Sequence, residues 1–144
     1  IISHSRVSSH VTWIDFCSQP DRIYKASDDF VSKSRYEGMP YVVLEALATN
    51  LPIVLTACTG HRDFQRLEFN SADFVPLESP ARVADALLRC YDNRHLACNH
   101  REISRKIFSR DRAIERIIEI YDYVLASDRS NRDGYVAGML NLER

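Results

Sequence analysis

The sequence of 144 residues lacks the segments that direct a chain into or across a membrane. It contains no apolar run approaching the roughly 18 residues that a spanning helix requires. Its beginning, from Ile1 to Arg6, has neither the charged end nor the apolar core of a signal peptide. These absences predict a cytoplasmic protein.

Neither sign of charge is in excess, since 19 lysines and arginines stand against 20 aspartates and glutamates and the formal net charge is -1. The sequence therefore lacks the overall basic field that attracts a whole domain to nucleic acid. We expect no nucleic-acid partner.

Cysteine is scarce, and the four cysteines form no Cys-x-x-Cys pair. Their irregular spacing argues against a zinc ribbon and against a small scaffold held together by disulfides. His95 and His100 likewise have no carboxylate or thiol at ligand spacing beyond Cys98. We therefore expect no bound metal, and reduced thiols in or near the core. The cysteines are Cys17, Cys58, Cys90 and Cys98.

What the sequence does contain is an alternation of short strand-like and helix-like segments. The β-branched and aromatic segments predict strands at 10–15, 29–33, 52–57 and 72–77. The segments between them predict helices at 20–26, 41–49 and 62–67, the last after a turn at Thr59-Gly60. Such alternation is typical of an α/β fold in which an open parallel sheet carries helices on both faces.

Local signals place the strands within the sheet and end one of the helices. The mostly apolar segment 52–57 suits a central strand that is buried on both faces. Pro76 cannot donate a hydrogen bond, which predicts an edge position for 72–77. Asn50 and Pro52 close the preceding helix, because Asn accepts the left-handed conformation and Pro cannot continue a helix.

The remainder of the chain is predicted to be helical as far as residue 126. Helices are expected at about 80–93 and 96–108, and Ser109 can cap a third helix. Segment 127–144 loses this periodicity and is expected to form a loosely ordered tail. The apolar stripe of the first helix comprises Val83, Ala84, Leu87, Leu88 and Tyr91, and that of the third Ile114, Ile117, Ile118, Tyr121, Val124 and Leu125.

The segment from Ser34 to Ala48 is the one that carries chemistry, because it lies between a predicted strand and the helix that follows. Ligands of open parallel sheets bind at the carboxyl ends of the strands. Gly38 removes a side chain where a ligand could approach the backbone, and Pro40 suits the first helical position. The free N–H groups of the first helical turn offer a site for a diphosphate.

Two carboxylates flank this site. Glu45 follows Tyr41 by one turn and leans toward the helix N-terminus, where it could accept hydrogen bonds from two ribose hydroxyls. Glu37 lies in the preceding loop, where it could bind a sugar hydroxyl or stabilise positive charge at an anomeric carbon. The alternative is that Glu37 merely favours a helix N-terminus and Glu45 is a solvated surface residue. Apolar neighbours on all sides of Glu45 predict that its helix is buried on most faces.

At these residues the sequence resembles the C-terminal domain of the retaining, nucleotide-sugar-dependent glycosyltransferases of family 4 (group 1). The resemblance runs from about Val11 to Leu125, and these enzymes have two Rossmann-like domains in the arrangement called GT-B. Its core is a Glu-x7-Glu motif within Ser-Arg-Tyr-Glu-Gly-Met-Pro, followed by Glu-Ala-Leu-Ala and Leu-Pro-Ile-Val. Tyr24-Lys25-Ala26-Ser27-Asp28 and Phe108-Ser109 add to the match.

The resemblance implies a role for each matching residue. Glu37 corresponds to the glutamate that contacts the donor sugar and supports the charged transition state, and Glu45 to the ribose-binding glutamate. The loop and helix start that meet the sugar and the diphosphate correspond to Gly38, Met39, Pro40 and Tyr41. Asp15 and Phe16 occupy the place where the family holds the nucleobase, although Phe16 could instead be a core aromatic residue.

Other positions depart from the family pattern or leave two interpretations open. The family often has two glycines after the strand that corresponds to 52–57, whereas only Gly60 is present here. His61 could contact phosphate or serve as a solvated helix cap. The family's Arg and Lys that neutralise the diphosphate, and the domain that binds the acceptor, lie upstream of Val11, so 1–126 is expected to be a partial donor-binding domain.

The implied function is retaining transfer of a sugar from a nucleotide diphosphate donor to a glycan or lipid-linked acceptor, without a metal or another cofactor. The acceptor would bind through an N-terminal domain that this sequence lacks. The alternative function is a non-catalytic module that binds a nucleotide sugar or a partner protein. A generic dinucleotide-binding domain would have a Gly-x-Gly-x-x-Gly motif, which is absent.

A run of basic residues near the end of the chain also has two interpretations. Because acidic residues are interspersed, the run can be a solvated helical face. It could instead contact the anionic inner face of a membrane, where lipid-linked acceptors reside, which would make the protein peripheral there. The basic residues are Arg101, Arg105, Lys106, Arg110, Arg112 and Arg116.

Overall fold

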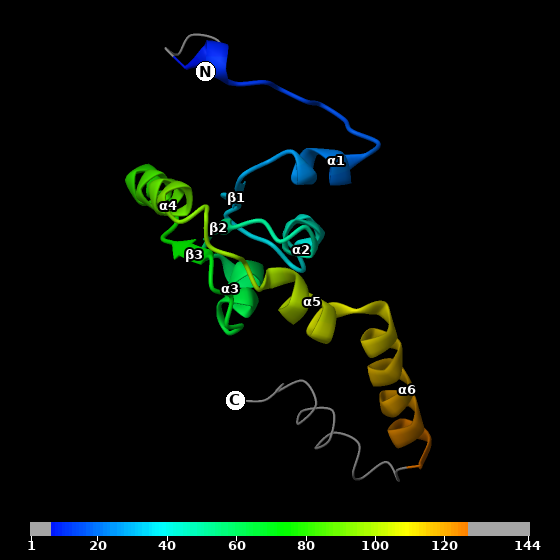
Figure 1. Ribbon diagram of the computed structural model, residues 1–144. Helices are drawn as coiled ribbons and strands as arrows, with labels where there is room; N and C mark the ends of the chain where they lie inside the picture. Colours follow the sequence, from blue (N-terminus) through cyan, green and yellow to red (C-terminus); the bar gives the residue numbers. More distant parts are fainter. Residues whose placement is uncertain (1–6, 127–144) are drawn as a thin grey trace.

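The computed structural model describes residues 7–126, which form an α/β fold (Figure 1). The elements alternate as far as β3, and helices follow. In chain order they are the 3-10 helix η2 (Ser8–His10), α1 (Pro20–Lys25), β1 (Phe30–Ser32), α2 (Tyr41–Ala48), β2 (Ile53–Thr56), α3 (Thr59–Gln65), β3 (Ala72–Val75), α4 (Pro80–Asp92), α5 (His100–Phe108) and α6 (Arg110–Ala126).

The described strands form one parallel sheet in the order β1-β2-β3. Phe30 on β1 pairs with Ile53 on β2, which pairs with Ala72 on β3. All four residues of β2 are buried, as a central strand requires. The predicted α/β class, the central position of β2 and the edge position of β3 are therefore confirmed.

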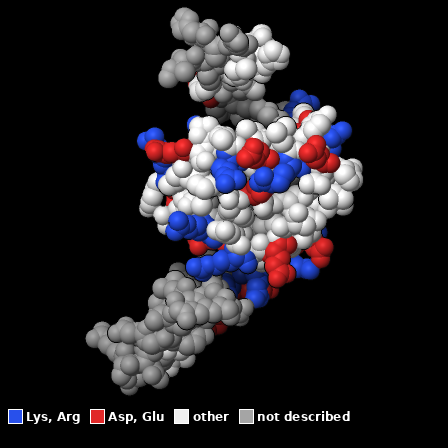
Figure 2. Space-filling model, turned by 90° about the vertical axis from the view of Figure 1, so that its left-hand side faces the viewer, with Lys and Arg blue, Asp and Glu red and all other residues white. Residues whose placement is uncertain are grey.

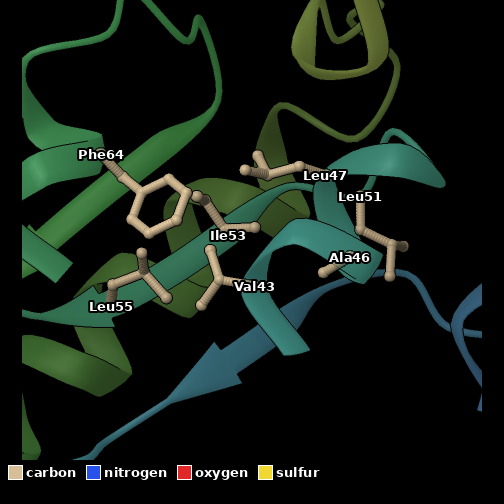
Figure 3. Packing of buried hydrophobic residues seen from close by; sticks show 7 residues of the cluster. All are labelled: Val43, Ala46, Leu47, Leu51, Ile53, Leu55 and Phe64. Carbon is tan, nitrogen blue, oxygen red and sulfur yellow. The ribbon is translucent and has the colours of Figure 1, made fainter. Parts of the chain in front are cut away.

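Alternate side chains of β2 point to two different cores. Ile53 and Leu55 pack with Leu47 of α2 and Phe64 of α3, as Figure 3 shows from close by. Val54 points to the opposite face of the sheet, where the cluster is completed by Val75, Ala86 and Cys90. Helices therefore cover both faces, α2 and α3 on one and α4 on the other, as predicted.

The connection from α2 to β2 takes the conformation expected from its sequence. Asn50 has a φ of 67°, in the left-handed region. Its side-chain amide donates to the carbonyl of Cys98 at 2.8 Å and accepts from the Arg101 N–H at 3.0 Å. Asn50 therefore ends α2 and also holds the start of α5.

The strand predicted at 10–15 is not formed. Segment 11–19 has no regular structure, and Trp13 and Phe16 are 80% and 85% exposed. A strand needs a neighbour whose backbone groups it can pair with, and no described strand lies next to this segment. Its β-branched and aromatic residues favour a strand, but composition alone does not provide a neighbouring strand to pair with.

The helices after β3 differ in detail from the prediction. The buried side of α4 consists of Val83, Ala86, Leu87 and Cys90, whereas the predicted members Leu88 and Tyr91 are 63% and 58% exposed. The helix predicted from residue 96 begins only at His100, and no turn separates Thr59-Gly60 from α3, which starts there. On α6 the predicted cap is confirmed, because the Ser109 hydroxyl accepts from the Arg112 N–H at 3.3 Å.

Charged side chains of both signs are interspersed on the face of the molecule that includes α4 (Figure 2). One pair joins α4 to the sheet, since Arg89 lies 2.9 Å from the carboxylate of Asp73. The predicted tail, 127–144, lies outside the described residues, and so do the first six positions of the predicted domain 1–126.

Candidate functional site

The loops after β1, β2 and β3 meet at one edge of the sheet, because the strands are parallel. An exposed ion pair joins two of these loops, with Arg35 after β1 lying 2.9 Å from Glu78 after β3. The loop after β1 contains Glu37 and leads directly into α2. The predicted site therefore lies at the edge where α/β proteins bind ligands.

The N-terminus of α2 is open to a ligand. Pro40 is the N-cap residue, and no side chain bonds to the first amides of the helix. Pro40 is buried, whereas Met39 and Tyr41 beside it are 51% and 73% exposed. A Cβ added at Gly38 would meet no atom within 4 Å, so this position also faces open space. The helix dipole and the free N–H groups favour an anion here.

Glu37 is half-buried and held by a neighbouring hydroxyl. Ser34 Oγ donates to Glu37 Oε1 at 2.6 Å, and the Ser34 carbonyl accepts from Thr56 Oγ1 at 2.5 Å. The carboxylate therefore has a defined position relative to β2, and one oxygen, Oε2, has no bond to any described residue.

Glu45 is exposed, and the predicted burial of its helix on most faces is wrong. The buried side of α2 consists of Val43, Ala46 and Leu47, while Val42 on the opposite side is 45% exposed. The apolar residues surround the helix in sequence, but only one side of it meets the sheet. The argument that burial sets Glu45 apart from a surface residue therefore fails.

A tyrosine holds the Glu45 carboxylate instead. Tyr24 Oη donates to Glu45 Oε2 at 2.9 Å, and the Tyr24 ring packs on Phe30 with ring centroids 6.0 Å apart. Desolvation, and then the hydrogen bond and charge of Glu45, raise the pKa of Tyr24 to about 12. Tyr24 therefore remains a neutral donor at physiological pH. The sequence pattern included Tyr24 but gave it no role.

A groove of about 440 Å³ runs between α2 and α5 beside Glu45. It begins at Tyr41 and so continues from the α2 N-terminus along the helix. Two arginines of α5 line its far wall. The lining residues are Tyr41, Leu44, Glu45, Ala48, Arg101, Ser104, Arg105, Phe108 and Ser109.

Asp15 and Phe16 are not joined to this site. Both lie in the irregular segment before α1, and no hydrogen bond or ion pair connects either to Glu37 or to α2 within the part of the chain that the structure describes. The alternative of Phe16 as a core residue is wrong, because 85% of it is exposed. Their contact with a nucleobase stays a prediction.

Three residues around the connection from β2 to α3 support the site: Thr56 ends β2, and Gly60 and His61 lie in α3. Thr56 bonds to Ser34, and Gly60 lies against the carbonyls of Glu37 and Gly38. His61 is fully buried, so its interpretation as a solvated cap is wrong. Its Nδ1 lies 2.7 Å from the Thr56 carbonyl oxygen. A small residue after a buried strand was the only signal in the sequence for this packing.

Among residues 7–126, no three His, Cys, Asp or Glu side chains come together as a metal site would require. Within the same residues, no helix has both the length and the apolar character needed to cross a bilayer. Cys58 and Cys90 are buried and Cys17 and Cys98 half-buried, all as free thiols.

Comparison with known proteins identifies the family. The family model described as glycosyl transferases group 1 matches residues 2–93, which include Glu37 and Glu45. The chain belongs to this family. Residues 2–93 also contain α2, the whole described sheet and all of α4.

Two relatives illustrate how the chain compares with longer proteins. It is 32% identical over 100 residues to the UDP-Gal:alpha-D-GlcNAc-diphosphoundecaprenol alpha-1,3-galactosyltransferase of Escherichia coli, covering 69% of this chain and 26% of that protein. It is 35% identical over 76 residues to an uncharacterised glycosyltransferase of Methanocaldococcus jannaschii, covering 52% of this chain and 19% of that protein. The chain thus spans about a quarter or less of these relatives. No solved structure matches it.

Proposed function

We propose that this chain forms most of the donor-binding half of a retaining glycosyltransferase. The enzyme would transfer a sugar from a nucleotide diphosphate to a glycan or a lipid-linked acceptor. No metal or other cofactor is part of this proposal. The donor is a substrate, and the described site offers it hydrogen bonds and the charge of a helix terminus.

The observation that carries the proposal is the arrangement of Glu37 and Glu45 around the open N-terminus of α2. The α2 amides would bind the diphosphate, with a helix dipole equivalent to roughly half a positive charge. Glu45, held by Tyr24 through Oε2, keeps Oε1 for ribose hydroxyls. Each glutamate would therefore bind a different part of the donor, Glu45 the ribose and Glu37 the sugar, and neither needs to lie against the diphosphate.

Glu37 would act at the sugar. Its Oε1 is held by Ser34, and its half-buried position limits the water that screens its charge. As the bond to the leaving diphosphate breaks, positive charge develops at the anomeric carbon, and a fixed carboxylate stabilises this charge. The interaction is stronger in the transition state than in the ground state, so it would raise turnover more than donor affinity.

The galactosyltransferase relative is named for an acceptor that carries a diphosphate lipid, which supports a lipid-linked acceptor as one choice here. A membrane contact through α5 and α6 gains less support. Three of the basic residues are neutralised by ion pairs along their own helix, so a solvated face explains the run better. The pairs are Lys106–Glu102, Arg112–Glu115 and Arg116–Glu119.

The test compares Glu45→Gln with Glu37→Gln in the complete gene product that contains this chain. Glu45→Gln should weaken nucleotide diphosphate binding, measured by calorimetry with UDP, GDP and ADP, by about tenfold, the effect of losing about 1.4 kcal/mol of charged hydrogen bonds. Glu37→Gln should leave that affinity within a factor of two and lower kcat.

The matched control is Glu68→Gln. Glu68 is exposed on the loop before β3, at the opposite edge of the sheet from the site, and its carboxylate bonds to no described residue. It should change neither property. Unchanged nucleotide affinity in Glu45→Gln would disprove the ribose assignment. Nucleotide binding without sugar transfer to any acceptor would favour the non-catalytic module.

A further inference from the structure

The loop that carries Glu37 packs against the last residue of β2, Thr56, and the first turn of α3, which contains Gly60 and His61. We propose that Thr56, Gly60 and His61 are positioning residues that hold the Glu37 loop in the geometry needed for transfer without touching the substrate. This inference rests on the proposed function for its effect on catalysis. Its effect on the order of the loop is independent of any ligand.

A chain of hydrogen bonds leads from the buried end of β2 to the carboxylate. Thr56 is 4% exposed, and its Oγ1 donates a hydrogen bond to the Ser34 carbonyl oxygen at 2.5 Å. Ser34 Oγ in turn donates to Glu37 Oε1 at 2.6 Å. Ser34 thus links the buried Thr56 side chain to the half-buried Glu37 carboxylate through two hydrogen bonds.

His61 holds Thr56 in turn. Its side chain is completely buried, and its Nδ1 lies 2.7 Å from the Thr56 carbonyl oxygen and 3.5 Å from Thr56 Oγ1. Because a carbonyl oxygen only accepts, Nδ1 donates the hydrogen of this bond. Nε2 bonds to nothing among the described residues. The imidazole therefore bonds to the backbone at the end of β2, and its complete burial keeps it from contacting a ligand.

Gly60 sets how closely α3 approaches the loop. A Cβ at this position would lie 2.2 Å from the Gly38 carbonyl oxygen and 2.7 Å from that of Glu37. Its φ is not positive, so space rather than backbone conformation requires glycine. The backbone of α3 thereby supports the loop on the side away from solvent, while Gly38 faces open space.

These contacts predict how the loop responds when the Thr56 hydroxyl is lost. Thr56→Val keeps the shape of the side chain but leaves the Ser34 carbonyl without its donor. Residues 34–42 should then open more often, and Glu37 should be less well placed. The remainder of the sheet, which is held by its own backbone hydrogen bonds, should not change.

The first measurement is hydrogen–deuterium exchange in the complete gene product without ligand. Thr56→Val should speed amide exchange by about tenfold at Val43 and Leu44, whose N–H groups bond to the carbonyl of Pro40 at the end of the loop, as loss of one hydrogen bond implies. Peptides of β3 and α4 should exchange as in the wild type. Thr56→Ser, which keeps the hydroxyl, should restore slow exchange, and Thr59→Val, the same change at an exposed residue of α3, should have no effect. Wild-type exchange in Thr56→Val would overturn the proposal.

The second measurement separates positioning from folding by kinetics. Thr56→Val should lower kcat by about tenfold with little change in donor KM, and adding it to Glu37→Gln should cause little further loss. If Thr56→Val fails to fold, Ser34→Ala is the test variant, because it removes the hydroxyl that donates to Glu37 and also lies 3.4 Å from Ser32 Oγ, and it leaves the Ser34 carbonyl bonded to Thr56. An unchanged kcat in Ser34→Ala would refute the positioning role. If amide exchange is faster in Thr56→Val but the wild-type protein binds no nucleotide, the proposed function is rejected. The positioning of the loop by Thr56 would still stand in that case.

Discussion

His100 is a buried imidazole that the site does not use. It has no exposed surface, its Nδ1 donates to the Leu51 carbonyl at 2.6 Å, and it meets the Phe69 ring edge-on with centroids 5.0 Å apart. Desolvation lowers the pKa of His100 below its ordinary 6.5, and the bond to Leu51 only partly opposes this shift. The folded protein therefore holds His100 neutral.

We expect this histidine to make the protein less stable in mild acid. Above pH 6.5 the imidazole is neutral in both states and contributes no pH dependence. Below pH 6.5 the unfolded chain binds the proton and the folded chain does not, so the free energy of unfolding decreases. Urea denaturation between pH 7.5 and 5 should show this decrease in the wild type and a smaller one in His100→Gln, whose amide can still donate. Equal slopes in the two proteins would contradict the assignment.

At the scale of the element, α4 has apolar residues on two sides and buries only one of them against the sheet. Its sequence offers Leu88 and Tyr91 as well as Ala86 and Cys90, and only the second pair packs against Val54 and Val75. The small Ala86 is fully buried where the helix meets the sheet. A larger side chain would therefore push α4 away from β2 and β3.

The same substitution at two positions of α4 tests this packing. Ala86→Leu should lower the free energy of unfolding by about 1–3 kcal/mol, because it overpacks a filled contact. Ala84→Leu, on the exposed side, should change it by less than about 0.5 kcal/mol. Chemical denaturation of both variants gives the comparison. Equal losses would contradict the burial of Ala86, and a larger loss in Ala84→Leu would mean that the helix buries the side predicted from its sequence.

At the scale of the whole molecule, the apolar side of α6 is not covered by other residues of the described segment 7–126. None of its residues is buried, and Ile117, Ile118 and Leu125 are 51%, 52% and 83% exposed. The relatives to which the chain is similar are far longer than it, since it covers 26% of one and 19% of the other. Residues 7–126 thus contain the proposed donor site and leave the apolar side of α6 uncovered.

We therefore expect the 144-residue chain by itself to transfer no sugar. Positioning of two reactants can contribute roughly 7–11 kcal/mol to lowering a barrier, and an isolated donor site has no means to position the acceptor. The assay would offer UDP-galactose and a diphospholipid-linked glycan to the purified chain, with its Glu37→Gln variant as background. The galactosyltransferase of Escherichia coli would show that the assay works. Transfer above that background would show that the chain contains the whole catalytic apparatus.

The sequence by itself determined the features that depend on local chemistry or on the order of elements. Alternating segments predicted the parallel α/β fold, a mostly apolar segment predicted the central strand β2, and Asn50 predicted the left-handed residue after α2. Gly38 and Pro40, between a predicted strand and a predicted helix, located the open helix N-terminus and the loop before it. These features hold because a few neighbouring residues suffice to set backbone conformation.

The tertiary structure alone decided which surfaces are covered. It left segment 10–15 without a partner strand, exposed Glu45 and bonded it to Tyr24, and buried His61 beside Thr56. Each outcome depends on contacts between residues far apart in the chain or between a helix and a sheet. Apolar neighbours along a sequence cannot show which of them face a partner, because burial is a property of the packed elements.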